Sequence, residues 1–271
     1  MTLASKTRYT WDDRVERADA LAQSLPFAAE ILKFYREIAL FQKALYANLE
    51  SCGYESTGEV FEQGLDLFIL LPKFQSLLYV VERAAPPELA QLAGKVEEEG
   101  PETWERLLNS FWVRHPQENG QEDQSVFFAR AFLQPVAEHL ASRAEFPRSN
   151  YTKAVCPFCE RKPLLGILRP EGDGAKRSLL CSLCSTEWDY RRILCPSCGE
   201  EQVDRLAVYT AAEFEHVRVN ACDTCHTYTK TVDLTKDGFA IPVVDELATI
   251  PLNLWAEEKG YQKLQPNLLQ M

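Results

Sequence analysis

Eight cysteines in the second half of the chain form four Cys-x-x-Cys pairs, an arrangement that can hold metal ions. The pairs are Cys156/Cys159, Cys181/Cys184, Cys195/Cys198 and Cys222/Cys225. One Cys-x-x-Cys turn directs two sulfurs at a single ion, and two such turns supply the four ligands of a tetrahedral zinc or iron site. The four cysteine pairs therefore predict two metal ions, each bound by four cysteines.

An internal repeat indicates which pairs share an ion. Each unit consists of a Cys-x-x-Cys turn, two short segments of strand character and a second Cys-x-x-Cys turn. The two turns are separated by 21 residues in the first unit and by 23 in the second. The repeat predicts site 1 from Cys156, Cys159, Cys181 and Cys184, and site 2 from Cys195, Cys198, Cys222 and Cys225. The alternative joins Cys181/Cys184 to Cys195/Cys198, which are ten residues apart.

The spacing suits zinc and iron equally. Cys-Pro-x-Cys-Gly, present at 195–199, occurs in zinc ribbons and in rubredoxins, and the other three pairs are followed by Glu160, Ser185 and His226. His226 is an alternative ligand that ranks below the cysteines, and Cys52 is expected to be a small buried residue.

Four protein ligands leave no open position on the ion for hydrolytic catalysis. Because the sequence also contains no familiar pattern of nucleophile and base, we predict that the protein is not an enzyme.

Helical periodicity dominates the first half of the chain and must supply the scaffold for these sites. Between residues 27 and 49, apolar side chains recur every three or four positions, which places them on one face of a helix. Further helices are expected over 11–24, 59–84, 87–98, 101–113 and 122–142, with Pro and Gly residues separating several of them.

The pattern changes after Pro147, where short strands replace the helical periodicity. Segments 164–169 and 177–181 flank the turn signal Pro-Glu-Gly-Asp-Gly, and segments 205–210 and 216–220 form a similar pair. The predicted fold class is α+β. Residues 1–150 form an all-helical domain, 151–190 a first four-cysteine module of rubredoxin-like or zinc-ribbon type, and 191–271 a second such module with a C-terminal tail.

Charge and hydropathy exclude several classes of partner. The 271 residues carry a net charge of -11, with 15 positive and 23 negative side chains in residues 1–150 and 14 and 17 in residues 151–271. Nucleic-acid affinity depends largely on Lys and Arg contacts to phosphates, so a nucleic-acid partner is not expected.

The most apolar stretch, 65–81, is interrupted by Asp66, Pro72 and Lys73, and is too short to insert in a membrane. Residues 1–14 lack the apolar core of a secretory signal, so we expect a cytoplasmic protein, whose cysteines stay reduced.

These motifs resemble the FdhE family of formate dehydrogenase accessory proteins. The resemblance rests on the four cysteine pairs and on the residues around them. It includes Trp188 and Arg192 between the units, Tyr228 and Lys230 after the last pair, the tail segments 245–249, 254–256 and 260–261, and Arg14, Arg17 and 18–21 in the helical half.

The resemblance implies a cytoplasmic assembly factor with rubredoxin-type iron sites. Such a protein binds the catalytic subunit of a formate dehydrogenase and is required for the activity of that enzyme. A basic face at Arg161, Lys162, Arg191 and Arg192 is a candidate contact for this client. The alternatives are a rubredoxin-type electron carrier and, ranked below it, a zinc-ribbon nucleic-acid binder. The resemblance favours iron over zinc.

Overall fold

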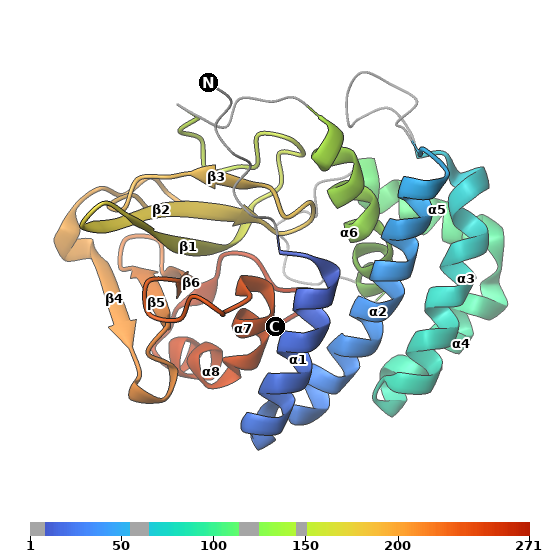
Figure 1. The fold of residues 1–271 in the computed structure, drawn as a ribbon, viewed down its shortest axis with the longest axis horizontal. Helices are drawn as coiled ribbons and strands as arrows, with labels where there is room; N and C mark the ends of the chain where they lie inside the picture. Colours follow the sequence, from blue (N-terminus) through green and yellow to red (C-terminus); the bar gives the residue numbers. More distant parts are fainter. Residues whose placement is uncertain (1–8, 55–64, 114–124, 145–150) are drawn as a thin grey trace.

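The computed structural model describes residues 9–54, 65–113, 125–144 and 151–271, and places a helical region beside a sheet region (Figure 1). The helical region contains α1 (Trp11–Ser24), α2 (Ala29–Ser51), α3 (Leu67–Ala84), α4 (Pro87–Glu99), α5 (Pro101–Val113) and α6 (Val126–Arg143). The predicted helices are thus confirmed, although their parts at 59–64 and 122–124 lie outside the described residues. Within the described ranges, no helix combines the length and the hydropathy needed to cross a bilayer.

Local signals fix the starts of the helices, and burial fixes their arrangement. The backbone N–H of Asp13 donates to the Thr10 hydroxyl at 3.1 Å, and the N–H of Thr10 donates to the Asp13 carboxylate at 2.8 Å, which forms a capping box at α1. Helices α4 and α5 each begin at a proline, where the missing N–H costs nothing. Helix α6 is buried on nearly all sides, as expected of a central helix, and α2, α3 and α5 pack around it.

The sheet region contains both predicted hairpins in a single seven-stranded sheet. Its strands are β1 (Pro163–Glu171), β2 (Gly174–Cys181), β3 (Glu187–Asp189), β4 (Leu206–Thr210), β5 (Val217–Cys222), β6 (Thr227–Asp233) and β7 (Gln262–Lys263). The order is β3-β2-β1-β6-β5-β4, with β7 beside β6. The sequence did not predict β6, which runs antiparallel to β5 and parallel to β1. Through β6, the two units of the repeat share one sheet.

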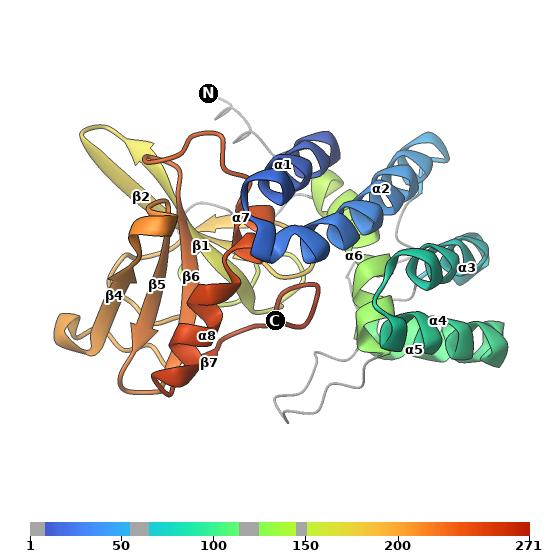
Figure 2. The ribbon, with the colours of Figure 1, turned by 90° about the horizontal axis from the view of Figure 1, so that it is seen from below.

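Helices α7 (Pro242–Ala248) and α8 (Ile250–Glu258) lie against the sheet, and α7 also contacts α1 and α2 (Figure 2). A buried ion cluster ties this segment to β6. The Lys230 ammonium lies 2.9 Å from the Glu246 carboxylate, and both side chains are fully buried. Lys263 also contacts this carboxylate. Burial alone would raise the pKa of Glu246, but the two ammonium groups lower it to about 2, so the carboxylate stays ionised.

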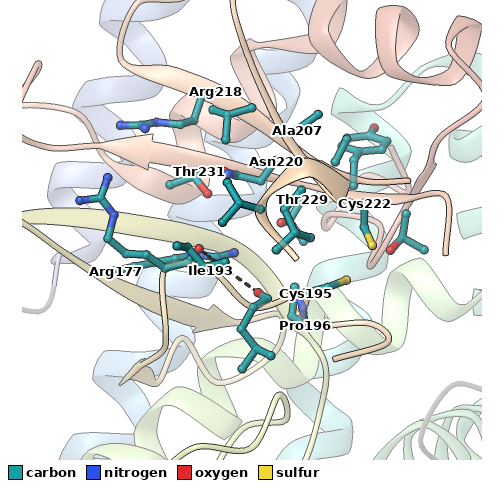
Figure 3. A pocket seen from close by; sticks show the side chains of 18 of the residues that line it. Arg177, Ile193, Cys195, Pro196, Ala207, Arg218, Asn220, Cys222, Thr229 and Thr231 are labelled. Carbon is teal, nitrogen blue, oxygen red and sulfur yellow. Dashed lines mark hydrogen bonds between the residues drawn. The ribbon is translucent and has the colours of Figure 1, made fainter. Parts of the chain in front are cut away.

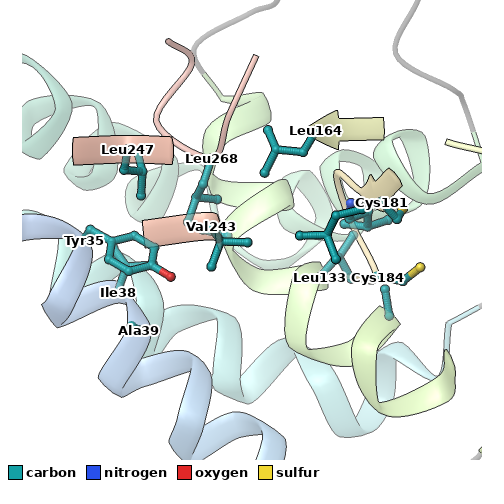
Figure 4. Close-up of a cluster of buried hydrophobic side chains, with 14 of the residues drawn as sticks. Tyr35, Ile38, Ala39, Leu133, Leu164, Cys181, Cys184, Val243, Leu247 and Leu268 are labelled. Atoms are coloured by element: carbon teal, nitrogen blue, oxygen red, sulfur yellow. Dashed lines mark hydrogen bonds between the residues drawn. The ribbon is translucent and has the colours of Figure 1, made fainter. Parts of the chain in front are cut away.

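One hydrophobic core runs from the helices into the sheet region. Figure 4 shows Tyr35 and Ile38 of α2, Val243 of α7 and Leu133 of α6 within this core, which also includes Cys181. Because the core is continuous, the helices and the first four-cysteine unit stabilise each other. The division of the chain into domains at residues 150 and 190 stays a prediction.

Arg161 does not belong to the expected basic face, whereas Arg191 and Arg192 are exposed. The Arg161 side chain is buried, its guanidinium lies 4.4 Å from the centroid of the Phe111 ring, and it donates a hydrogen bond to the Phe111 carbonyl. Arg161 therefore joins the first cysteine unit to the end of α5, because an arginine can stack on an aromatic ring while it binds a carbonyl. Arg191 is exposed but paired with Glu201 at 2.7 Å.

Substituting alanine for Gly166 is expected to disrupt the junction of the two units. Gly166 of β1 lies opposite Thr231 of β6, and a Cβ at Gly166 would approach the Thr231 hydroxyl to 2.5 Å. Since overpacking of this kind costs about 1–3 kcal/mol, Gly166→Ala should lower the free energy of unfolding by that amount. Gly174→Ala, where the nearest heavy atom lies 3.9 Å away, is the control and should change stability by much less. Equal effects in chemical denaturation would contradict the explanation.

Candidate metal centres

The first cysteine cluster lies at the base of the β1–β2 hairpin. Cys156 and Cys159 precede β1, and Cys181 ends β2, with Cys184 in the turn that follows. The sulfur of Cys156 lies 3.5 Å from that of Cys184, and the sulfur of Cys159 lies 3.3 Å from that of Cys181 and 3.6 Å from that of Cys184. Ligands about 2.3 Å from a tetrahedral ion have their sulfurs about 3.8 Å apart, so the cluster has nearly the dimensions of a zinc or iron thiolate site.

Backbone N–H groups and a hydroxyl support the sulfurs of this cluster. The N–H of Phe158 points at the sulfur of Cys156, and the N–H of Leu183 at that of Cys181, both at 3.4 Å. The Cys184 thiol donates to the Thr186 hydroxyl at 3.1 Å. The two N–H donors stabilise the thiolate form that binds a metal.

The second cluster repeats this arrangement between β4, β5 and β6. The sulfur–sulfur distance is 3.7 Å for both Cys195–Cys225 and Cys198–Cys222. The N–H of Ser197 points at the Cys195 sulfur at 3.4 Å. Partial burial opposes ionisation of Cys225, but hydrogen bonds from Thr227 outweigh it and lower the pKa of Cys225 to about 6. A thiolate is therefore available in this cluster at neutral pH.

The structure brings the eight cysteines together in the sequential pairing that the repeat predicts. In each cluster the four sulfurs lie within 4.8 Å of one another, and the pairs 181/184 and 195/198 belong to different clusters. His226 is not part of the second cluster: it is exposed, and its ring lies 6.3 Å from that of Tyr261. That both clusters bind metal ions stays a prediction, which this geometry supports.

The residue after the second cysteine of each pair adopts a left-handed backbone conformation. The φ angles are 57° at Glu160, 51° at Ser185, 79° at Gly199 and 54° at His226. Only glycine adopts this region freely, and another residue there costs on the order of 1 kcal/mol. The Cys-x-x-Cys turn imposes this conformation in all four pairs, which explains why glycine is frequent at the position. A non-glycine residue there is expected to have another role.

Ser185 has such a role, because it connects the first cluster to the helical region. Its hydroxyl donates to the Glu138 carboxylate at 2.7 Å. Arg14 of α1 binds the same carboxylate through two guanidinium nitrogens, at 2.9 and 3.0 Å, and both charged side chains are buried. Sequence reasoning did not identify this contact. Its one available signal was a charged residue inside each of two otherwise apolar helix faces.

The two clusters differ in their exposure. All four cysteines of the first cluster are buried, whereas Cys198 of the second is exposed and Cys225 is partly exposed. The first cluster lies against the helical region, since Ser185 beside it binds Glu138 of α6, whereas the second adjoins the C-terminal segment, where the N–H of Gln262 donates to the His226 carbonyl at 2.7 Å.

We expect a chelator to remove the metal ions in two kinetic phases. The second cluster should lose its ion at least about tenfold faster, because a competing ligand reaches an exposed thiolate without local unfolding. Release at neutral pH can be followed with a colorimetric metal indicator. Cys198→Ser should abolish the fast phase and preserve the slow one. A single phase, or a fast phase that survives in Cys198→Ser, would contradict the assignment.

The ninth cysteine corrects one prediction. Cys52 was expected to be buried, but it is exposed at the end of α2. Helix α2 ends at Ser51, so Cys52 occupies the capping position instead of the apolar face that the periodic pattern defines.

A third group of possible ligands is better explained by ion pairing. His216, Asp237 and Asp245 lie within 4.8 Å of one another. Arg17 already occupies this position, since its guanidinium donates to Asp237 at 2.8 Å and to Asp245 at 3.0 Å. This network joins α1 to α7, and we do not assign a metal ion to it.

The fold and the sites define the class of protein: an α+β chain in which a helical region is joined to a sheet region with two four-cysteine clusters. Family models of the FdhE central domain and of the FdhE C-terminal domain match residues 155–192 and 193–270. A protein FdhE homolog of Proteus mirabilis is 30% identical, with 94% of this chain and 86% of that protein covered. The chain therefore belongs to the FdhE family.

Two further similarities extend over nearly the whole chain. A protein FdhE homolog of Aquifex aeolicus is 27% identical over 270 residues, which cover 94% of this chain and 93% of that protein. The crystal structure of the FdhE protein from Pseudomonas aeruginosa superimposes with a TM-score of 0.73 at 24% identity, and covers 97% of this chain and 96% of that chain. The latter similarity supports the fold, including the helical region that neither domain model reaches.

Proposed function

We propose that this protein is an assembly factor that binds the catalytic subunit of a formate dehydrogenase and is required for the activity of that enzyme. The observation that carries the proposal is membership of the FdhE family. The two clusters fit a role in binding, because four protein ligands close each site to substrates.

The architecture suits a rigid binding protein. The helices, the first cluster and the sheet share one core, and buried ion pairs at Arg14–Glu138 and Lys230–Glu246 connect elements that are distant in sequence. A surface held in one conformation loses little entropy when it captures a partner. In this proposal the metal ions hold that surface in one conformation.

We further propose that the protein acts in the cytoplasm and holds iron in both clusters, with zinc as the alternative metal. The sulfur–sulfur distances of 3.3 to 3.7 Å in the two clusters are too long for disulfides, which agrees with a reducing compartment. Anaerobic purification followed by metal analysis should give two ions per chain. Ferric thiolate would give visible charge-transfer absorption, whereas a colourless protein with two zinc ions would overturn the assignment of iron.

The client is tested by co-purification in the native host. A tagged catalytic subunit of the formate dehydrogenase should retain the wild-type protein, and a deletion strain should lose formate oxidation. Complementation with Cys52→Ser should restore activity, because this thiol belongs to neither cluster. Complementation with the double variant Cys181→Ser, Cys184→Ser should not. Normal formate oxidation in the deletion strain, together with no retained protein, would refute the proposal.

The exposure of Cys198 favours one alternative, a rubredoxin-type electron carrier. A thiolate ligand at the surface shortens the path of an electron to a partner, and Cys198 is the exposed ligand of the second cluster. This function requires a reversible reduction potential and turnover with a reductase. Both can be measured on the iron-loaded protein, and loss of both in Cys198→Ser would localise electron exchange to the second cluster.

A further inference from the structure

A cavity of about 430 Å³ lies between the two units of the repeat, next to the second cysteine cluster. Its floor is the face of β5 and β6 that carries Arg218, Asn220, Thr229 and Thr231 (Figure 3). Its opposite wall is formed by Arg177 of β2 and by the connecting segment 192–196. The volume falls in the range of small-molecule sites.

The floor is polar because of strand alternation. Side chains two residues apart along a strand point to the same face. Arg218 of β5 lies opposite Thr231 of β6, Asn220 opposite Thr229 and Cys222 opposite Thr227. The intervening side chains Val217, Val219 and Val232 are buried on the other face of the sheet. Two rows of polar side chains are thus directed into the cavity, and the third row, Cys222 and Thr227, belongs to the second cluster.

Three arginines line the cavity although the protein is acidic. The lining contains Arg177, Arg192 and Arg218 and no Asp or Glu, whereas the whole chain has a net charge of -11. The cysteines of the lining, Cys195 and Cys222, belong to the second cluster and carry negative charge as thiolates. Arg218 is paired with Asp233, which is outside the lining. Among the described residues, Arg177 has no carboxylate partner: one of its nitrogens donates to the carbonyls of Arg191, Arg192 and Leu194, each at 3.2 Å. A buried positive charge of this kind favours an anion beside it.

Three buried polar atoms of the lining lack a hydrogen-bond partner. They are Nε of Arg177, the side-chain oxygen of Asn220 and the hydroxyl of Thr231. Arg177 is 6% exposed and Thr231 is 1% exposed. Buried polar atoms are nearly always hydrogen-bonded, so the two donors of this group, Nε of Arg177 and the hydroxyl of Thr231, indicate a ligand that accepts hydrogen bonds. The Asn220 oxygen is an acceptor and requires a donor group on the ligand.

We propose that this cavity binds a phosphate-bearing small molecule. The phosphate accepts hydrogen bonds from the arginines and from the threonine hydroxyls, and its charge is balanced by Arg177 and Arg192. An organic group attached to it contacts the apolar part of the lining, which includes Ile193, Leu206 and Val208. Because Cys195 and Cys222 also line the cavity, the ligand lies beside the second cluster. This site is independent of the proposed client.

Calorimetric titration of the metal-loaded full chain tests the proposal with three probes at constant ionic strength. Inorganic phosphate should bind in the millimolar range or tighter. Phenyl phosphate should bind more tightly than phosphate, because its ring contacts the apolar wall. Acetate should bind at least tenfold more weakly than phosphate, because a planar monoanion engages fewer of the donors.

Matched variants separate the cavity from general electrostatics. Arg192→Gln and Arg205→Gln each remove one exposed charge from the same part of the chain, but only Arg192 lines the cavity. Thr231→Val and Thr210→Val make the same change inside and outside it. We expect Arg192→Gln and Thr231→Val to weaken phosphate binding at least fivefold and the two outside variants to leave it within twofold. Melting temperatures of all four variants establish that they fold.

Absence of phosphate binding by the wild-type protein would overturn the proposal. Equal weakening by Arg192→Gln and Arg205→Gln would do so too, because it would show attraction to net charge alone. Binding of acetate as tight as that of phosphate would refute the assignment of the ligand class.

Discussion

Replacing Cys181 with serine is expected to remove one of two metal ions per chain and to loosen the helices from the sheet. Cys181 lies in the cluster whose four cysteines are all buried, and its neighbour Ser185 binds Glu138 in the helical region. Binding of a structural metal contributes about 10–16 kcal/mol in small zinc modules, and this energy is folding energy. Loss of even part of it exceeds the effect of an ordinary core substitution.

Metal analysis, thermal unfolding and limited proteolysis measure this effect. Cys181→Ser should retain about one ion per chain, melt at a lower temperature and be cleaved between the helical and sheet regions. Cys198→Ser is the matched variant in the exposed cluster, and it should lose one ion with little effect on the helices. Cys52→Ser should keep both ions and the wild-type melting temperature. If Cys181→Ser and Cys198→Ser behaved alike, the first cluster would not support the helical region.

Substitution of Arg14 by methionine should destabilise the protein by about 3–5 kcal/mol, because it leaves the buried Glu138 carboxylate without its guanidinium partner. Both side chains are only 3% exposed, so water cannot replace the lost partner. Chemical denaturation gives the free energy of unfolding. Helix α1 should also become more accessible to hydrogen exchange, since this ion pair connects it to α6.

Two further variants test the explanation. Arg36→Met breaks a half-exposed pair with Asp19, whose nitrogen–oxygen distance is the same 2.9 Å, and a second pair with the adjacent Glu37. Its cost should be no more than about 1 kcal/mol. The double variant Arg14→Met, Glu138→Leu removes both buried charges and should recover much of the lost stability. A double variant as unstable as Arg14→Met would show that packing of the arginine, not its charge, is what matters.

Sequence patterns over short distances determined much of the fold. Apolar residues every three or four positions located the helices, and the ends of 11–24 and 101–113 agree with α1 and α5. Turn signals located the hairpins β1–β2 and β4–β5. The cysteine repeat indicated the grouping of all eight cysteines, because the spacing within a unit sets how far two Cys-x-x-Cys turns can be apart.

Contacts between distant segments were decided only by the tertiary structure. Strand β6 contains Lys230 amid threonines, and the sequence does not predict it as a central strand because the partners that bury Lys230 lie in another segment. Each buried cation has a partner from a distant segment: Lys230 pairs with Glu246, Arg161 stacks on Phe111, and Arg14 pairs with Glu138. A charged side chain alone predicts exposure, since burial of a charge is costly without a partner. The partner is fixed by the packing of the two regions, which no local pattern in the sequence encodes.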